Sequence, residues 1–141
     1  SSGVMYYYRV RAVNANGVSE SSNVISAITI PSNPVATDAT LITTSSFQAN
    51  WNAVTGAANY KLDVSTNDAF SSFVTGYNSL TVSGNSLDVA GLAINTSYYY
   101  RVIAENESGI SGNSNLIAVT LIPVAGSDPA MVPAITELVG C

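Results

Sequence analysis

The chain has 141 residues and a net charge of −5; apolar residues make up 47% of it and charged residues only 9%. Four basic residues are too few for the clustered Lys and Arg of a nucleic-acid-binding surface or of a patch that binds anionic lipid. The chain has no histidine and one cysteine, Cys141, which excludes a Ser-His-Asp arrangement, an internal disulfide and a cysteine metal cluster.

The first predicted element is a two-stranded hairpin at residues 1–30. The stretch "YYYRVRAVNANGVS", which begins at Tyr6, is nearly repeated as "YYYRVIAENESGIS" from Tyr98. The offset of 92 residues (98 − 6) holds without a gap from there to Pro31 and Pro123, and 14 of these 26 pairs are identical. This period exceeds the 20–50 residues of solenoid repeats and matches a small domain. We therefore predict tandem domains, with residues 1–30 forming the last two strands of a preceding domain.

Residues 31–122 are predicted to form a complete domain, joined to the hairpin by the short linker Pro31–Pro34. Alternating apolar and polar residues predict strands near residues 47–51, 60–65, 87–89, 98–104 and 116–122, with one or two edge strands between 73 and 82 that break near Gly76. Turn residues separate these segments. The pattern predicts an all-β fold, a seven-stranded antiparallel β-sandwich.

This pattern resembles a fibronectin type III domain. The residues that carry the likeness are Trp51, Tyr60, Leu92, Tyr98, Tyr100, Val102 and Ala104, followed by the turn motif N-x-x-G-x-S at Asn106, Gly109 and Ser111. The resemblance implies that Trp51, Tyr60, Leu92, Tyr98, Tyr100 and Val102 form the structural core. A single cysteine favours this family over true immunoglobulin domains, which pair cysteines across their sheets. The sequence motif "YYYRVRAVNANG" also resembles repeats of long secreted surface proteins of Gram-negative bacteria. This resemblance implies a bacterial protein that is extracellular or on the cell surface.

The corner tyrosine has a physical reason. The ring of Tyr98 is large and apolar, but its hydroxyl needs a hydrogen-bond partner when it is buried. At the start of a strand the ring fills one end of the core. We expect its hydroxyl to reach a main-chain group in the preceding crossover.

The hairpin would expose a broad aromatic face. Tyr6, Tyr8, Val10 and Ala12 are the equivalents of inward core residues, and a lone two-stranded hairpin is only marginally stable in water. Three explanations remain open. The missing strands lie upstream in a longer tandem protein, or another molecule donates them, which builds a filament if it repeats head to tail, or the hairpin packs against its own neighbouring domain.

Side chains on the outer faces are candidates for a partner surface. Asp63 and Arg101 are expected to point outward from neighbouring strands and to form an exposed ion pair worth ~0–1 kcal/mol. Tyr99 also points away from the core, where a tyrosine can stack on a sugar or support its cross-strand neighbours. The candidate partner surface comprises Tyr6, Tyr8, Tyr99 and Arg101.

The sequence indicates a non-catalytic structural or adhesion module of an extracellular or cell-surface protein. We expect no enzyme activity, no catalytic residue, no cofactor and no bound metal. We also expect no membrane insertion, because no apolar run approaches the ~20 residues that span a bilayer. The expected partners are neighbouring repeats or identical subunits in a filament, and also surface glycans or other cell-surface proteins. The alternative is an accessory domain of a large secreted enzyme, such as one acting on polysaccharides. Residues 123–141 are predicted to be a proline-containing linker or the start of a further domain.

Overall fold

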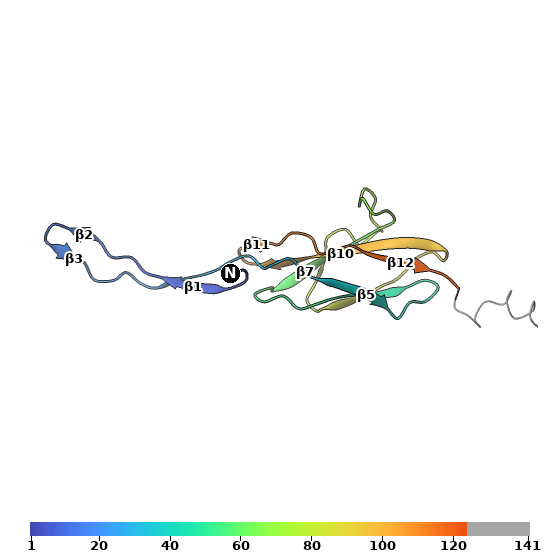
Figure 1. The fold of residues 1–141 in the computed structure, drawn as a ribbon, viewed down its shortest axis with the longest axis horizontal. Coiled ribbons are helices and arrows are strands. Elements are labelled where there is room, and N and C mark those ends of the chain that lie inside the picture. Colours follow the sequence, from blue (N-terminus) through green and yellow to red (C-terminus); the bar gives the residue numbers. More distant parts are fainter. Residues whose placement is uncertain (124–141) are drawn as a thin grey trace, which may run out of the picture.

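The computed structural model describes residues 1–123, so nearly all of the predicted linker at 123–141 lies outside the described residues. Within residues 1–123 the chain forms twelve strands and no helix. No helix that could cross a membrane is found in this part of the chain. Figure 1 shows an elongated molecule, with a β-sandwich and a narrow hairpin that extends from one end of it. The predicted all-β class is confirmed.

The sandwich consists of two antiparallel sheets. One sheet has three strands in the order β5-β6-β9, with the bounds Ala36–Thr40, Phe47–Trp51 and Ser86–Val89. The other contains β7, β8, β10, β11 and β12, with the bounds Asn59–Ser65, Leu80–Val82, Thr96–Asn106, Gly109–Ile110 and Ile117–Leu121. In this sheet β10 lies between β7 and β12, and β8 forms the edge beyond β7.

The core of the sandwich is built on β10, which turns every second side chain inward. Tyr98 is 5% exposed, and Tyr100 and Val102 are fully buried. Two aromatic contacts cross the core: Phe47 stacks on Tyr100 with 5.7 Å between ring centroids, and Trp51 lies against Tyr60 at 5.6 Å. One buried cluster contains all the residues that the sequence placed in the core, namely Trp51, Tyr60, Leu92, Tyr98, Tyr100 and Val102.

The strands differ from the predicted ones in one place. The strand β5 was not predicted, because three of the five residues in its sequence "ATDAT" are alanine or aspartate, which are depleted in strands. The segment 73–82 forms a bridge, Ser65 to Phe73, and then the short edge strand β8, with Gly76 between them.

The buried tyrosine hydroxyls bind main-chain groups. The Ala93 N–H donates to the Tyr98 hydroxyl at 2.9 Å, which is the predicted corner. The Tyr100 hydroxyl donates to the Thr37 carbonyl on β5, so this residue connects the two sheets. Burial raises the pKa of the Tyr100 phenol, and the nearby Asp38 carboxylate adds to the rise, while a hydrogen bond from the Asn50 backbone opposes it.

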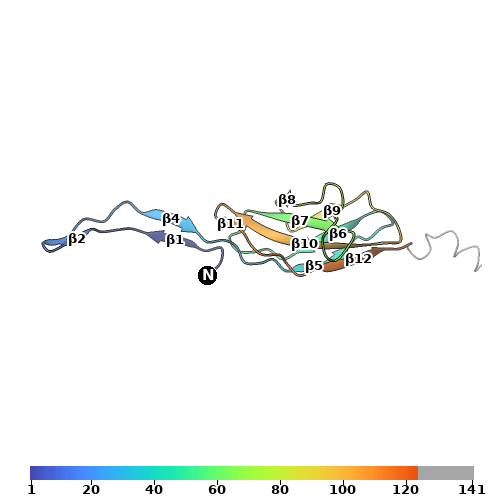
Figure 2. The ribbon, with the colours of Figure 1, turned by 90° about the horizontal axis from the view of Figure 1, so that it is seen from above.

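The hairpin extends away from the sandwich instead of folding back on it (Figure 2). Its strands are β1 and β4, with the bounds Met5–Tyr8 and Ile25–Ile28, and β2 and β3 at its tip, with the bounds Val13–Asn14 and Gly17–Val18. Tyr6 and Tyr8 remain 47% and 55% exposed. Tyr6 and Tyr8 are therefore not covered by the chain's own sandwich, which rules out the third of the three explanations.

We expect Tyr98→Phe to lower the free energy of unfolding by ~1 kcal/mol or more, because the mutation leaves the Ala93 N–H without its partner. Chemical denaturation followed by Trp51 fluorescence measures the change. Tyr99→Phe, on the outer face of the same strand, is the control, with an expected change below ~0.5 kcal/mol. Equal stabilities of the two variants would contradict a structural role for the corner.

Candidate interaction surfaces

The hairpin repeats the strand pairing of the complete domain in the same register. Tyr6, Tyr7 and Tyr8 pair with Ala27, Ser26 and Ile25. With the offset of 92 residues, the equivalent positions Tyr98, Tyr99 and Tyr100 pair with Val119, Ala118 and Ile117. The turns match too, since Asn14 pairs with Gly17 as Asn106 pairs with Gly109. Residues 1–30 therefore reproduce the last two strands of the sandwich in structure as well as in sequence.

Two serines in each copy explain part of the repeated motif. The Ser114 and Ser111 hydroxyls accept hydrogen bonds from the Val102 and Ala104 N–H groups, each at 2.9 Å. In the hairpin, the Ser22 and Ser19 hydroxyls accept the equivalent bonds from Val10 and Ala12, at 2.9 and 2.8 Å. These hydroxyls satisfy N–H groups where the regular ladder is interrupted, so the hairpin and the sandwich share the same side-chain hydrogen bonds at these positions.

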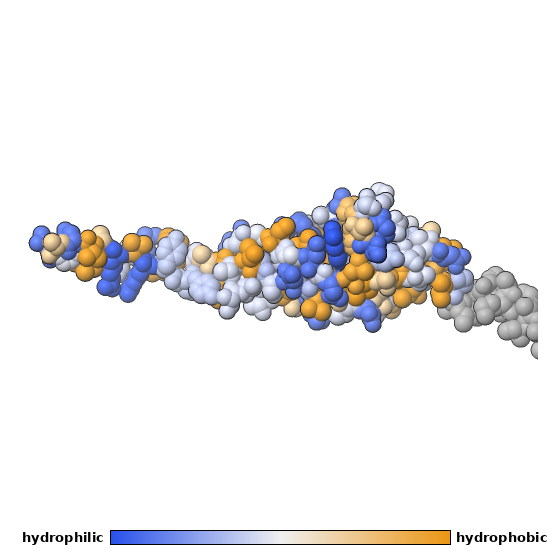
Figure 3. Space-filling model, turned by 45° about the horizontal axis from the view of Figure 1, so that its top comes forward, coloured by the Kyte–Doolittle hydropathy of each residue, from blue (hydrophilic) through white to orange (hydrophobic). Residues whose placement is uncertain are grey.

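The surface formed by Tyr6, Tyr8, Val10 and Ala12, which we call the hairpin face, is exposed. Val10 is 62% exposed, whereas its equivalent Val102 is fully buried. In the space-filling view the hairpin shows apolar side chains among hydrophilic ones (Figure 3). Because its residues are exposed where their equivalents in the complete domain are buried, the hairpin face is a candidate interaction surface.

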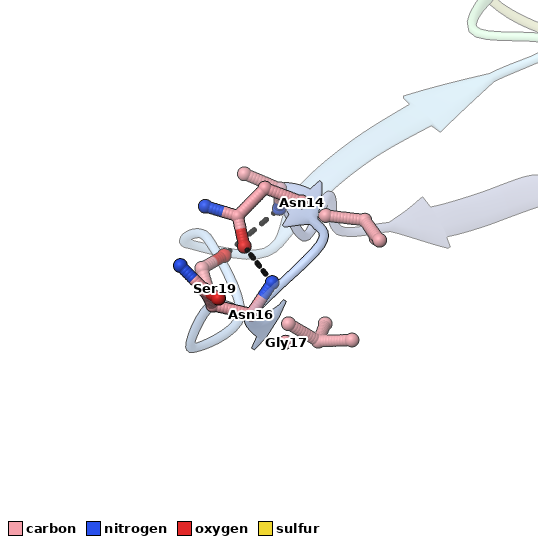
Figure 4. Close-up of a pocket in the computed structure, with 7 residues that line it drawn as sticks. Asn14, Asn16, Gly17 and Ser19 are labelled. Carbon is pink, nitrogen blue, oxygen red and sulfur yellow. Dashed lines mark hydrogen bonds between the residues drawn. The ribbon is translucent and has the colours of Figure 1, made fainter.

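The tip of the hairpin carries a hollow of about 360 Å³, lined by residues 12–14 and 16–19 (Figure 4). The Asn14 side chain accepts a hydrogen bond from the Asn16 N–H at 2.8 Å and holds the turn. No charged side chain lines the hollow, so it has no obvious chemistry for a small ligand. Asn14, which lines the hollow, is the equivalent of Asn106, and the Asn106 side chain binds the main chain at the base of the hairpin.

The hairpin meets the sandwich at a joint formed by Gly3, Thr29, Gly56, Asn106 and Ser108. The Asn106 amide donates to the Thr29 carbonyl at 2.8 Å and to the Gly56 carbonyl at 3.0 Å. The Ser108 hydroxyl donates to the Ile28 carbonyl. Turn residues of the sandwich thus bind the main chain at the base of the hairpin.

Two glycines allow the main chains to touch at the joint. Gly3 and Gly56 have φ of +64° and +76°, in the region that favours glycine. A Cβ on Gly3 would lie 1.9 Å from the Thr55 carbonyl oxygen, and a Cβ on Gly56 would lie 2.3 Å from the Gly3 oxygen. No other residue type fits at either position without moving the two parts relative to each other.

The linker adds to the fixed geometry of the joint. Pro31 and Pro34 are both buried, and the Asn33 side chain accepts a hydrogen bond from the Gly112 N–H at 2.8 Å. Each proline fixes its backbone angle φ and thereby reduces the number of conformations that the linker can adopt. The connection between hairpin and sandwich is therefore a bound, stiff segment.

The predicted pair of Asp63 and Arg101 forms, but not in the exposed setting that the sequence indicated. Arg101 Nε lies 3.0 Å from the Asp63 carboxylate, whose side chain is only 6% exposed. The Ser79 N–H donates to the same carboxylate at 2.7 Å, and the Arg101 guanidinium lies 4.1 Å from the centre of the Phe70 ring. The loop between β7 and β8 covers the pair. Asp63 therefore lies on the outer face of β7 as predicted, but the prediction that it is exposed is wrong.

The predicted partner residues therefore fall into separate places. Tyr6 and Tyr8 belong to the hairpin face, Tyr99 is half-buried on the outer face of β10, and Arg101 is engaged by Asp63 and Phe70. The joint was not predicted from the sequence, although an isolated glycine such as Gly3 or Gly56 can indicate a close approach of two main chains. Within residues 1–123 no three His, Cys, Asp or Glu side chains gather in a way that could hold a metal ion.

Comparisons with known proteins identify the fold. Residues 31–120 match the family model of the fibronectin type III domain. No curated protein sequence matches the chain. The domain of human fibronectin type III domain containing protein 3 is 23% identical, with a TM-score of 0.55 over 70% of this chain and 93% of that chain.

Two larger structures are also similar. The chicken CNTN1 FN1-FN3 domains are 22% identical, with a TM-score of 0.53 over 86% of this chain and 44% of that one. A β-1,2-glucanase from Parabacteroides distasonis is 15% identical, with a TM-score of 0.57 over 70% of this chain and 14% of the enzyme. Identities this low show a shared fold alone.

We expect Arg101→Ala to lower the free energy of unfolding by about 2 kcal/mol or more, because it leaves the buried Asp63 carboxylate without its cation. Lys61→Ala is the matched control, since Lys61 pairs with Glu105 at 3.4 Å on the same two strands with side chains 25% and 30% exposed. That exposed pair contributes about 0–1 kcal/mol. Similar losses in the two variants by chemical denaturation would contradict the importance of the covering loop.

Proposed function

Because the chain belongs to the fibronectin type III domain family, a common non-catalytic module of cell-surface proteins, we propose that it is a structural and adhesion module of an extracellular protein. It acts as a spacer, which holds neighbouring modules at a set distance and transmits tension between them. Its partners are neighbouring repeats of the same kind, with surface glycans or other cell-surface proteins as the ligands of the whole array.

The observation that carries this proposal is the joint. A spacer has to keep its modules in line, and the default between two domains is relative motion unless their interface is large. Here a four-residue linker with two buried prolines is supplemented by hydrogen bonds from Asn106 and by the contact of Gly3 with Gly56. These contacts favour a fixed orientation with little buried area.

A filament is the assembled form of the same function. In it the hairpin of one chain is completed by another chain, as the exposed hairpin face and its free strand edges permit. Identical subunits that repeat this contact head to tail form an open fibre.

A second candidate is an accessory domain of a large secreted enzyme that acts on polysaccharides, with the active site outside this chain. The similar fold within a β-1,2-glucanase favours it. For this function we expect the chain to retain glycans on an array and Tyr99→Ala to lose that signal at least tenfold, because aromatic rings stack on sugars. Tyr99→Phe, which keeps the aromatic ring at the same position, is the control; the absence of any glycan signal would leave the spacer function.

The rigid joint is testable with spin labels at Asn16 on the hairpin tip and Ser83 on the sandwich, in a Cys141→Ser background. We expect pulsed electron paramagnetic resonance to give one narrow distance distribution for the unmodified joint, and a broad or shifted one for Gly56→Ala, because the new methyl group meets Gly3.

Gly76→Ala is the matched control for this measurement. Gly76 also has a positive φ, +89°, but a Cβ there meets nothing within 4 Å, so the substitution carries the backbone strain without the collision. A broad distribution in the unmodified chain would contradict the spacer proposal.

A further inference from the structure

The turn at the tip of the hairpin contains the one Asn-Gly sequence of the chain, Asn16-Gly17. Glycine has no Cβ, so nothing on the residue itself hinders a reaction at its main-chain nitrogen. In an Asn-Gly sequence this nitrogen stands within reach of the asparagine side-chain amide. The same sequence is also common in hairpin turns for conformational reasons alone.

The equivalent turn of the sandwich shows that the conformation does not require an asparagine at this position. The Asn14 side chain accepts a hydrogen bond from the Asn16 N–H at 2.8 Å, and the Asn106 side chain accepts one from the Ser108 N–H at 2.9 Å. The first asparagine therefore holds both turns. The residue two positions later is serine in one copy and asparagine in the other, so the Asn16 amide is not needed to build the turn.

The surroundings leave both reacting groups open. Asn16 and Gly17 are exposed at the end of the hairpin (Figure 4), and no hydrogen bond with another part of residues 1–123 engages the Asn16 side chain. A Cβ built on Gly17 would meet nothing within 4 Å. The strands β2 and β3 that flank the turn have two residues each, and an exposed turn on such short strands opens readily.

We propose that Asn16 is a site of spontaneous deamidation, with the Gly17 main-chain nitrogen as the nucleophile and water as the second reactant. Hydroxide removes the Gly17 N–H proton, and the nitrogen attacks Asn16 Cγ. The new N–Cγ bond forms as the Cγ–Nδ2 bond breaks, and the leaving nitrogen takes a proton from water, so that ammonia departs and hydroxide is regenerated.

The first product is a five-membered cyclic imide. Water adds to one of its two carbonyl carbons and reopens the ring, which gives aspartate at one carbonyl and isoaspartate at the other. The reaction needs no acid or base from the protein, and its rate rises with pH because hydroxide starts it.

Both products change the hairpin tip. Aspartate adds a negative charge beside a hollow that no charged side chain lines, and an ionised carboxylate accepts hydrogen bonds but cannot donate one as the amide does. At the equivalent position the Ser108 hydroxyl uses its proton to bind the Ile28 carbonyl. Isoaspartate lengthens the main chain of a two-residue connection by one carbon, so the pairing of Asn14 with Gly17 no longer fits.

The test is incubation of the full chain in mildly alkaline buffer, followed by peptide mapping with mass spectrometry and by enzymatic methylation of isoaspartate. We expect Asn16 to react roughly tenfold faster or more than Asn85, because Asn85 precedes a serine, which has a Cβ. The Asn85 side chain also donates to the Trp51 carbonyl at 3.3 Å. In mildly acidic buffer the rate at Asn16 falls.

Asn16→Gln is the matched control. It keeps an amide at the tip but places the amide one carbon farther from the Gly17 nitrogen, so the mass of this peptide is expected to stay constant. An Asn16 that reacts no faster than Asn85 would overturn the proposal, and so would an equal mass change in the glutamine variant.

Ser108→Asn separates the effect of the open tip from that of the sequence, because it creates a second Asn-Gly sequence at the joint. There a Cβ on Gly109 would lie 3.3 Å from the Ile30 side chain, and the turn is bound to the base of the hairpin. We expect this amide to react roughly tenfold more slowly than Asn16, because a bound turn opens less often. Equal rates at the two positions, in a variant whose circular dichroism matches that of the unmodified chain, would contradict the assignment of the reactivity to the open tip.

Discussion

The structure depends on β10, because this strand fills the space between the sheets with tyrosine rings whose hydroxyls must find partners. Tyr98 bonds the crossover before the strand, and Tyr100 bonds β5 on the opposite sheet. A slip of one residue would turn both rings to solvent and both hydroxyls away from their partners. The register of β10 is thus fixed from both ends of the core, and the strands β7 and β12 on either side of it follow.

Much of this was predictable, because the signals are local in the sequence. Alternation placed Phe47 and Trp51 on one face of β6, and the repeat at an offset of 92 residues located β10 and its twin in the hairpin. The strand β5 gave no such signal, because Asn115 and Tyr100 hold it through side chains that lie far along the chain. Weak local propensity is overridden by partners that the local sequence does not reveal.

Asp63 shows the same limit at the candidate surface. Alternation correctly puts it on the outer face of β7, and the rule that outer faces meet solvent then predicts exposure. The loop between β7 and β8 folds over that face, where Phe70 and Ser79 enclose the ion pair. The path of an irregular loop is set by contacts such as these, which no period in the sequence encodes. The joint escaped prediction for a similar reason, since Gly3 and Gly56 are 53 residues apart (56 − 3).

The two ends of the complete unit are not equivalent, which would give the proposed array a direction. At the hairpin end the joint needs Gly3, because a Cβ there would collide with the Thr55 carbonyl. At the opposite end the equivalent position is Asn95, which has the same left-handed backbone, φ 57°, but carries a side chain. A following unit with loops like 55–57 would meet that side chain where the present unit meets open backbone. Asn14, by contrast, is identical to its equivalent Asn106 and lies at the tip of the hairpin. The asparagine of the joint is therefore repeated at the hairpin tip, whereas the glycine of the joint, Gly3, is replaced by Asn95 at the far end of the sandwich. In the tandem array that we propose, these contacts would match a neighbour of the same kind at the hairpin end of the sandwich, whereas the Asn95 side chain at the opposite end would not allow the same close contact.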